Sequence, residues 1–184
     1  SVYVVYGTSN EASRTTIQLS DLSSAANGQG FRIKGENNTG VVVAGVSDIN
    51  GDGLDDVLLQ STMGKVGTAT NPGAAWVAFG KKDGTTVNVS DLEAGVGGFA
   101  VDVGINAWNN GAYAVANAGD INGDGLADII VTNISGGAGV YNNGAAFVIY
   151  GKTGTGVVKV TNLAPSEGFR ILGLCAGDYF GITA

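Results

Sequence analysis

Two nine-residue stretches place acidic side chains and glycine in the same order: DINGDGLDD at residues 48–56 and DINGDGLAD at residues 120–128. Counted from the first residue, side-chain oxygens stand at positions one, three, five and nine, and glycine stands at position six. Glycine permits the tight turn that brings odd-numbered side chains toward one point, and the carbonyl at position seven adds another oxygen. The spacing therefore predicts two oxygen cages, made by Asp48, Asn50, Asp52, Leu54 and Asp56 and by Asp120, Asn122, Asp124, Leu126 and Asp128.

Calcium is the cation that best fits such a cage. It takes six to eight oxygens in flexible geometry, whereas magnesium demands a smaller octahedral shell and keeps several waters. Three carboxylates in an empty loop repel one another, and a bound ion relieves that repulsion. Two ions would change the formal net charge of the chain from −7 to −3. We expect two structural calcium sites.

Two other kinds of loop share parts of this pattern. An EF-hand needs a bidentate Glu at position twelve and flanking helices, but position twelve is Leu59 or Val131, so the bidentate carboxylate would be Asp56 or Asp128. The simpler alternative is a hairpin turn that binds no ion, since Asn-Gly and Asp-Gly are favoured turn dipeptides. That second alternative stays open at the level of sequence.

Catalytic constellations are missing from the sequence. The chain has no histidine, no G-x-S-x-G elbow and no phosphate-binding loop. Outside the two cages, the glutamates Glu11, Glu36, Glu93 and Glu167 show no pairing that would suit a glycosidase, and we expect them to be solvated loop residues. We therefore expect a protein that is not an enzyme.

The rest of the chain repeats with a period of about seventy residues. Three further motif series recur in the same order: YVVYG, WVAFG and FVIYG at 3–7, 76–80 and 147–151; TTIQLSDL, TTVNVSDL and VVKVTNL at 15–22, 85–92 and 157–163; and GFRIKG, GFAVDVG and GFRILG at 30–35, 98–104 and 168–173. Apolar residues alternate in the TTIQLSDL series, which predicts strands. The YVVYG series is apolar almost throughout, as in a strand buried on both faces, whereas Arg32 and Lys34 predict one wet face for the GFRIKG strand.

Adding one strand before each acidic loop (41–45, 112–116) and one after it (56–59, 128–131) gives four strands per repeat. Four-stranded antiparallel units in series are typical of an all-β protein made of β-propeller blades. A solenoid is the alternative, although its repeats are usually shorter.

Composition supports this fold class and limits the partners. Thirty-two glycines against two prolines, with 14% charged residues, indicate short strands and tight turns with almost no helix. A net charge of −7 argues against nucleic acid and anionic membrane surfaces, and no apolar stretch is long enough to insert in a membrane. The single cysteine, Cys175, is expected to be a buried thiol without a redox role.

The run AGDINGDGLAD, followed by FVIYGK and GFRILG, resembles the FG-GAP repeat, which builds the seven-bladed propeller of integrin α subunits and many secreted bacterial surface proteins. The resemblance implies calcium in the loop between the first two strands of a blade, on the ten loop residues named above. One departure is Ser47, where the second loop has the family-typical Gly119.

Under this resemblance, residues 1–184 are one FG-GAP propeller segment of a longer protein. The predicted division is a partial blade at 1–37, blades at 38–104 and 105–173, and the first strand of another blade at 174–184. Closed propellers usually have at least four blades, so missing sequence or other chains would complete the ring.

The expected function is a calcium-stabilised, extracellular module for adhesion to, or recognition of, protein or glycan. Loops that differ between the repeats, at 61–73 and 133–144, are the expected recognition surfaces, together with Trp108 in a loop; Trp76 is expected in the core. The alternatives are a structural subunit of an extracellular assembly and a noncatalytic part of a secreted enzyme.

Overall fold

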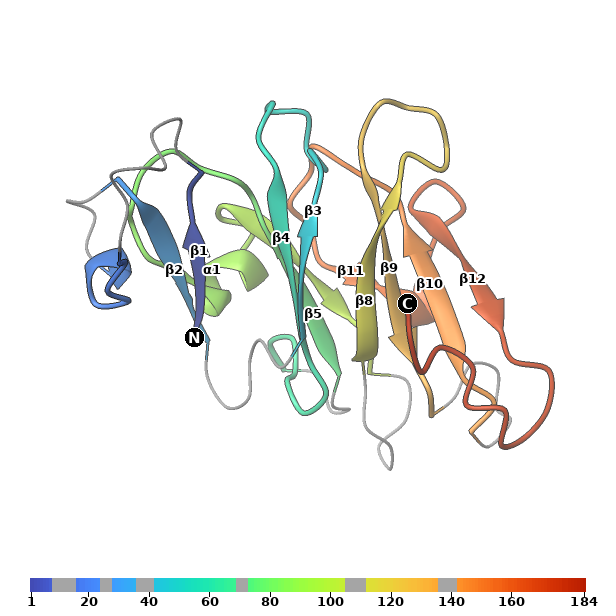
Figure 1. Ribbon diagram of the computed structural model, residues 1–184. Helices are drawn as coiled ribbons and strands as arrows, with labels where there is room; N and C mark the ends of the chain where they lie inside the picture. The colour runs from blue at the N-terminus through green and yellow to red at the C-terminus, as the bar shows by residue number, and fades with distance from the viewer. Residues whose placement is uncertain (8–15, 24–27, 36–41, 69–72, 105–111, 136–141) are drawn as a thin grey trace.

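The computed structural model describes residues 1–7, 16–23, 28–35, 42–68, 73–104, 112–135 and 142–184. These residues form three β-sheets that stand side by side along the molecule (Figure 1). The strands are β1 (Val2–Val5), β2 (Gly30–Lys34), β3 (Val42–Val46), β4 (Asp56–Ser61), β5 (Ala74–Ala78), β6 (Val87–Asn88), β7 (Gly98–Asp102), β8 (Ala112–Gly119), β9 (Asp128–Asn133), β10 (Ala145–Ile149), β11 (Val158–Lys159) and β12 (Gly168–Leu172). The helical segments are α1 (Val89–Glu93) and the short 3-10 helices Asp21–Ser23 and Val160–Asn162.

Two of the sheets contain a complete four-stranded antiparallel unit. In the middle sheet, β3, β4, β5 and β7 pair in chain order, and in the C-terminal sheet β8, β9, β10 and β12 do the same. The prediction of an all-β protein made of four-stranded propeller blades is confirmed. No helix in the described part of the chain combines the length and the apolar character that crossing a bilayer requires.

Of the three strands predicted to be buried on both faces, β5 and β10 are buried throughout, whereas β1 is only partly buried. Every residue of β5 and of β10 is buried, because each strand lies in the middle of its sheet with another sheet packed against it. The glycine that begins the last strand of a blade is needed for this packing. Gly98 has a φ of +155°, and a Cβ atom there would lie 2.0 Å from the carbonyl oxygen of Val77.

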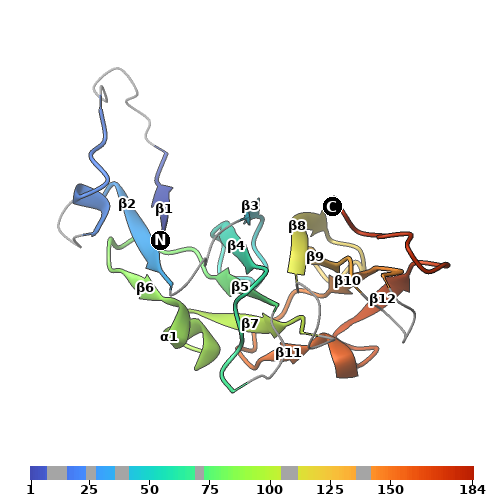
Figure 2. The same cartoon turned by 90° about the horizontal axis from the view of Figure 1, so that it is seen from below.

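The TTIQLSDL series does not form the strands that its alternating apolar residues predict. Only two residues of each later copy are extended: β6 pairs in parallel with β2, and β11 pairs in parallel with β7 (Figure 2). The chain then turns into a helix because Asp91 accepts hydrogen bonds from the backbone N–H and the side-chain amide of Asn88, at 3.3 and 2.8 Å. Each segment therefore joins the sheet of the preceding repeat rather than its own.

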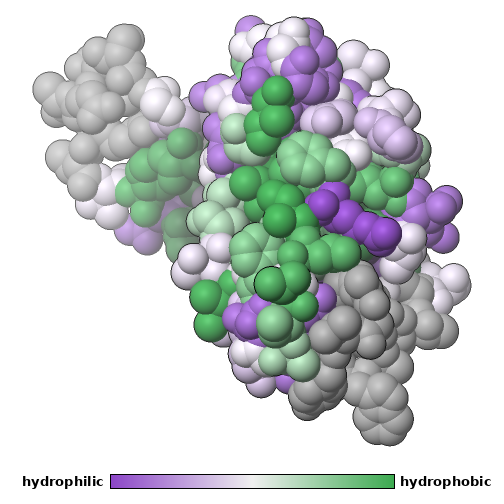
Figure 3. Space-filling view, turned by 90° about the vertical axis from the view of Figure 1, so that its right-hand side faces the viewer, coloured by the Kyte–Doolittle hydropathy of each residue, from purple (hydrophilic) through white to green (hydrophobic). Residues whose placement is uncertain are grey.

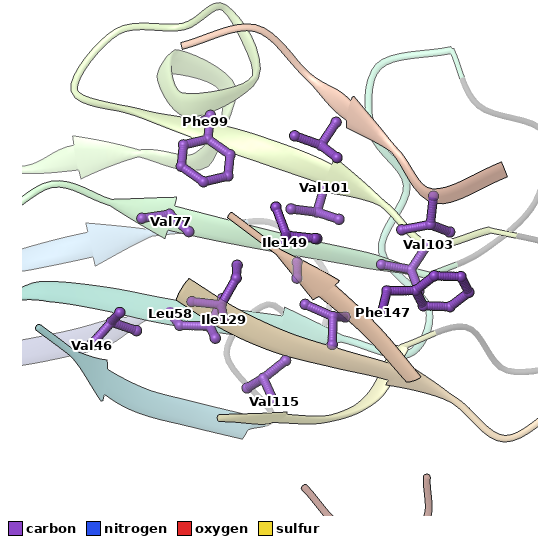
Figure 4. Packing of buried hydrophobic residues seen from close by; sticks show 14 of the residues in the cluster. Val46, Leu58, Val77, Phe99, Val101, Val103, Val115, Ile129, Phe147 and Ile149 are labelled. Atoms are coloured by element: carbon purple, nitrogen blue, oxygen red, sulfur yellow. The ribbon is translucent and has the colours of Figure 1, made fainter. Parts of the chain in front are cut away.

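Two apolar clusters fill the spaces between neighbouring sheets. The larger lies between the middle and C-terminal sheets and includes Val77, Phe99, Ile129 and Phe147 (Figure 4). The second lies between the first two sheets and contains Trp76, which confirms the prediction that Trp76 is a core residue.

The C-terminal residues differ from two predictions. Residues 178–184 form no strand; instead Phe180 bridges to Gly144, and Thr132 Oγ1 donates to the carbonyl oxygen of Gly181 at 2.6 Å. Cys175 is exposed rather than buried, because it lies in a turn that is closed by a 2.7 Å hydrogen bond from its own N–H to Asp178.

Candidate functional site

The two acidic loops lie at one edge of the molecule, at the top of Figure 1, where they join β3 to β4 and β8 to β9. Their glycines adopt left-handed conformations that other residues rarely reach: φ is +83° at Gly53 and +90° at Gly125. The loops begin differently, because Gly119 has a φ of +72° after an irregularity in β8, whereas β3 ends before Ser47. The Asn117 side-chain amide lies 3.4 Å from the Ser47 hydroxyl and links the two loop entrances.

The first aspartate of each loop organises the turn through backbone amides. Asp48 accepts hydrogen bonds from the N–H groups of Gly51, Asp52 and Gly53 at 2.6, 3.0 and 2.7 Å. Desolvation acts to raise the pKa of Asp48, but these backbone hydrogen bonds outweigh it and lower the pKa. The second loop repeats the arrangement.

In that second loop, Asp120 accepts from Gly123, Asp124 and Gly125 at 2.7, 3.1 and 2.9 Å. The middle of both loops is also alike. The Asn50 amide donates to Asp52 at 3.0 Å, and the Asn122 amide donates to Asp124 at 2.8 Å.

The last aspartate of each loop is buried and joins the loop to the end of the following hairpin. Asp56 accepts from the N–H groups of Ile49 and Gly80 at 2.8 and 2.6 Å. Burial raises the pKa of Asp56 to about 6, against the opposing effect of these hydrogen bonds, and the charges of Asp52 and Asp48 add to the rise. The three carboxylates of the first loop therefore interact electrostatically.

Asp128 holds the second loop in the same way. It accepts from the N–H groups of Ile121 and Gly151 at 2.7 and 2.8 Å. Both loops thus place their predicted oxygen-bearing side chains in one local network, with the ninth-position carboxylate buried beneath it.

The oxygen donors of both loops suit a hard cation, but the side-chain oxygens of each loop do not converge on one point. An ionised carboxylate has about four lone-pair sites, so the backbone hydrogen bonds leave acceptor capacity for an ion. Among the described residues, no group of three or more His, Cys, Asp or Glu side chains is close enough together to hold a metal ion. The carboxylates would have to move closer together to share a calcium ion.

A cavity lies between the first two sheets. This cavity of about 580 Å³ is lined by residues that include Lys34, Met63, Lys65, Trp76, Ser90 and Glu93. Glu93 lies on its wall and accepts hydrogen bonds from the Trp76 indole N–H at 3.2 Å and from the Gly67 N–H at 3.0 Å.

The prediction that Glu93 is a solvated loop residue is wrong. Glu93 is the last residue of α1, and its carboxylate accepts a hydrogen bond from Trp76, a contact that only folding brings about. Glu167 is also partly buried, and it accepts from the Ala164 N–H at 3.1 Å. The predicted recognition loop at 61–73 contributes Met63 and Lys65 to the cavity. Trp108, Glu11, Glu36 and residues 136–141 of the second predicted loop lie outside the described residues.

A family model for the FG-GAP repeat matches residues 111–149. The match runs from β8 through the second acidic loop and β9 to the end of β10. The comparison with curated proteins gives no match.

Proposed function

Because residues 111–149 are an FG-GAP repeat and the middle sheet has the same strand order, we propose that this chain is a calcium-stabilised segment of an extracellular β-propeller that recognises protein or glycan without catalysis. The observation that carries the proposal is the shared network of the two acidic loops. Two loops 72 residues apart place the same oxygens on the same backbone amides, which supports one common role.

Calcium would add to the stability that this network already provides. Binding would draw together carboxylates that now repel one another and would hold the hairpin in its folded form. An ion that binds only the folded state stabilises it by about 4 kcal/mol per site at a thousandfold excess over the dissociation constant. Asp48, Asn50, Asp52, the Leu54 carbonyl and Asp56 would hold one ion, and the equivalent residues 120–128 would hold the other.

An extracellular location agrees with both the FG-GAP match and the proposed calcium sites. FG-GAP repeats occur in extracellular proteins. Extracellular calcium is plentiful enough to fill sites of moderate affinity, such as those of extracellular modules that bind in the 10⁻⁴–10⁻³ M range.

Recognition is proposed for the cavity between the first two sheets. It combines two lysines, a hydroxyl and a fixed carboxylate with the apolar surfaces of Met63 and Trp76, which suits a ligand with polar and apolar faces. A glycan array, probed with and without calcium, tests this part of the proposal. Binding that Lys34→Gln weakens supports the cavity, and binding unaffected by that change places recognition elsewhere.

Calorimetric melting with excess calcium and then with chelator tests the metal. The wild-type protein is expected to lose several degrees of melting temperature in chelator, and the Asp52→Ala, Asp124→Ala double variant is expected to lose little, because it lacks one carboxylate from each cage. Asp55→Ala is the matched control, since Asp55 is exposed, adjacent to the ninth position and replaced by Ala127 in the second loop.

Identical melting curves with calcium and with chelator would leave the loops as hairpin turns that need no ion. A chelator effect that persists in the double variant would place the calcium site elsewhere in the chain.

A further inference from the structure

The two junctions between neighbouring sheets use the same strand pairings but differ at the place where the cavity lies. At the second junction, Asn133 ends β9, and its side-chain amide donates to the carbonyl oxygen of Val103 at 3.0 Å, across the gap between the sheets. Ser61 ends β4 at the equivalent position of the first junction. Its hydroxyl accepts a hydrogen bond from the Gly64 N–H of its own loop at 2.8 Å. The shorter serine side chain therefore leaves the first junction open, where the cavity of about 580 Å³ lies.

The strand ends beside this gap differ in the same way. Val103 follows β7 and is 0% exposed, because its side chain packs in the cluster between the middle and C-terminal sheets. Gly35 takes the equivalent position after β2 and brings no side chain to the cavity that it lines. Both walls of the cavity belong to this chain: β2 and residues 88–93 form one, and the loop between β4 and β5 forms the other. Residue differences between the repeats therefore open the cavity.

Lys34 brings a positive charge to the cavity that its strand partner does not balance. Lys34 lies opposite Asn88 in the pair of β2 and β6, whereas the equivalent residue Asp102 lies opposite Lys159 in the pair of β7 and β11. Lys34 is exposed and forms no ion pair with any described residue. Lys65 adds a second ammonium group to the lining. In a chain with a net charge of −7, these two lysines make the cavity a local site for an anion.

Glu93 limits which anion fits. Its two oxygens accept hydrogen bonds from the Trp76 indole N–H and the Gly67 N–H, which fix the carboxylate on the cavity wall. A carboxylate has about four lone-pair sites, so Glu93 can also accept hydrogen bonds from a ligand. A ligand carboxylate next to Glu93 would be repelled. The anionic group of the ligand must therefore lie at the lysines, and groups that donate hydrogen bonds must lie at Glu93.

A sugar that carries a carboxylate combines these two requirements. Its hydroxyl groups can donate to Glu93, and its carboxylate can accept from the ammonium groups of Lys34 and Lys65. The cavity volume lies within the range of about 300–1,000 Å³ that is usual for small-molecule sites. An acidic peptide would bring carboxylates without the array of hydroxyl donors that Glu93 requires. The side of the C-terminal sheet shown in Figure 3 differs from the cavity, because apolar residues gather at its centre.

We propose that the cavity binds a carboxylate-bearing sugar, with Lys34 and Lys65 at the carboxylate and Glu93 at the hydroxyl groups. The inference rests on the proposed recognition function, because it names the class of ligand for the same cavity. It needs no bound ion in the acidic loops.

The test is an NMR titration of the whole chain with methyl glycosides of four sugars. Glucuronic acid and galacturonic acid carry a carboxylate at the carbon where their neutral partners, glucose and galactose, carry a hydroxymethyl group. An acidic glycoside is expected to shift the assigned Trp76 indole N–H signal and to bind about tenfold more tightly than its neutral partner, because only the acidic sugar gives Lys34 a charged acceptor.

Four variants separate charge from shape. Lys34→Asp introduces the residue of the second junction and should abolish the preference for acidic sugars, whereas Lys34→Arg should keep it. Ser61→Asn retains both lysines but introduces the side chain that spans the second junction, so it should weaken binding of acidic and neutral sugars alike. Lys82→Gln is the matched control, because Lys82 is exposed and does not line the cavity, and it should bind like the wild type. Thermal melting checks that each variant is folded.

Equal affinity for acidic and neutral glycosides would overturn the acidic class and leave sugar recognition by the cavity standing. Undetectable binding of all four glycosides would overturn both this inference and recognition by the cavity. A preference that survives Lys34→Asp, or that Lys82→Gln removes equally, would also overturn the inference. The melting experiment with calcium and chelator is independent of each of these outcomes.

Discussion

The surroundings of Asp56 and Asp83 shift the pKa values of these two carboxylates in opposite directions. Burial raises the pKa of Asp56 to about 6. Asp83 is exposed, and hydrogen bonds from Thr85 and Lys81, followed by the charge of Lys81, lower its pKa to about 2. Its carboxylate also forms an ion pair with Lys81 at 2.9 Å. The same residue type thus has different charge behaviour within and outside the acidic loop.

The lowered pKa of Asp83 leads to a prediction about acid. Because the folded pKa lies below the ordinary value, the ionised form favours the folded state above about pH 4, and that contribution is lost as the pH falls through about 2. Thr85→Val removes the largest cause and should move the NMR titration midpoint of the Asp83 carboxyl carbon toward 3.8. Thr86→Val is the control and should leave the midpoint near 2; a wild-type midpoint near 3.8 would contradict the prediction.

Two lysine side chains connect each of two sheets to the preceding one. The Lys81 ammonium lies 5.7 Å from the centre of the Phe31 ring, and the Lys152 ammonium lies 4.5 Å from that of Phe99. Burial lowers the pKa of Lys152, against the charge of Glu167, which raises it. In both places the residue after the glycine that ends one hairpin covers the phenylalanine of the preceding repeat.

The glycine before that phenylalanine gives a prediction about strand packing. Gly98→Ala should destabilise the protein by more than about 3 kcal/mol, because a Cβ atom would meet the Val77 carbonyl oxygen and φ is unfavourable for alanine. Denaturant unfolding measures the change. Gly154→Ala is the control, since a Cβ there meets nothing within 4 Å, and its effect should stay within about 0.5 kcal/mol. Equal effects of the two variants would show that backbone crowding at Gly98 is unimportant.

The charge of the whole molecule predicts how salt affects it. With a net charge of −7 and two acidic loops on one edge, like charges repel in the folded state, and salt screens that repulsion. In chelator, raising sodium chloride from ~10 mM to ~300 mM should raise the melting temperature by roughly 2–4 °C, equivalent to about 1 kcal/mol. A constant or falling melting temperature in a scanning calorimeter would mean that this repulsion does not limit stability.

Local patterns in the sequence were enough to predict the blades. Glycine-broken acidic loops with apolar strands on either side, and the recurring YVVYG and GFRIKG series, predicted four strands per repeat and the deep burial of β5 and β10. These signals are readable because turn chemistry and strand periodicity depend on residues close together in the chain. The oxygen-bearing residues of both loops are read from the sequence in the same way, whereas their convergence on a calcium ion stays a prediction.

Tertiary structure decided the features that depend on distant residues. The segment at 85–92 became β6 and α1 because its first residues pair with β2 of the preceding repeat. Glu93 became part of a cavity wall because folding brings Trp76 and Gly67 to it. Ile49 and Ile121 occupy the same position in the same motif, yet Ile49 is buried and Ile121 is exposed, because a following sheet covers Ile49 and, in the described part of the chain, no following sheet covers Ile121. The sequence by itself therefore determined what each repeat is, whereas packing between repeats determined which of its surfaces remain open.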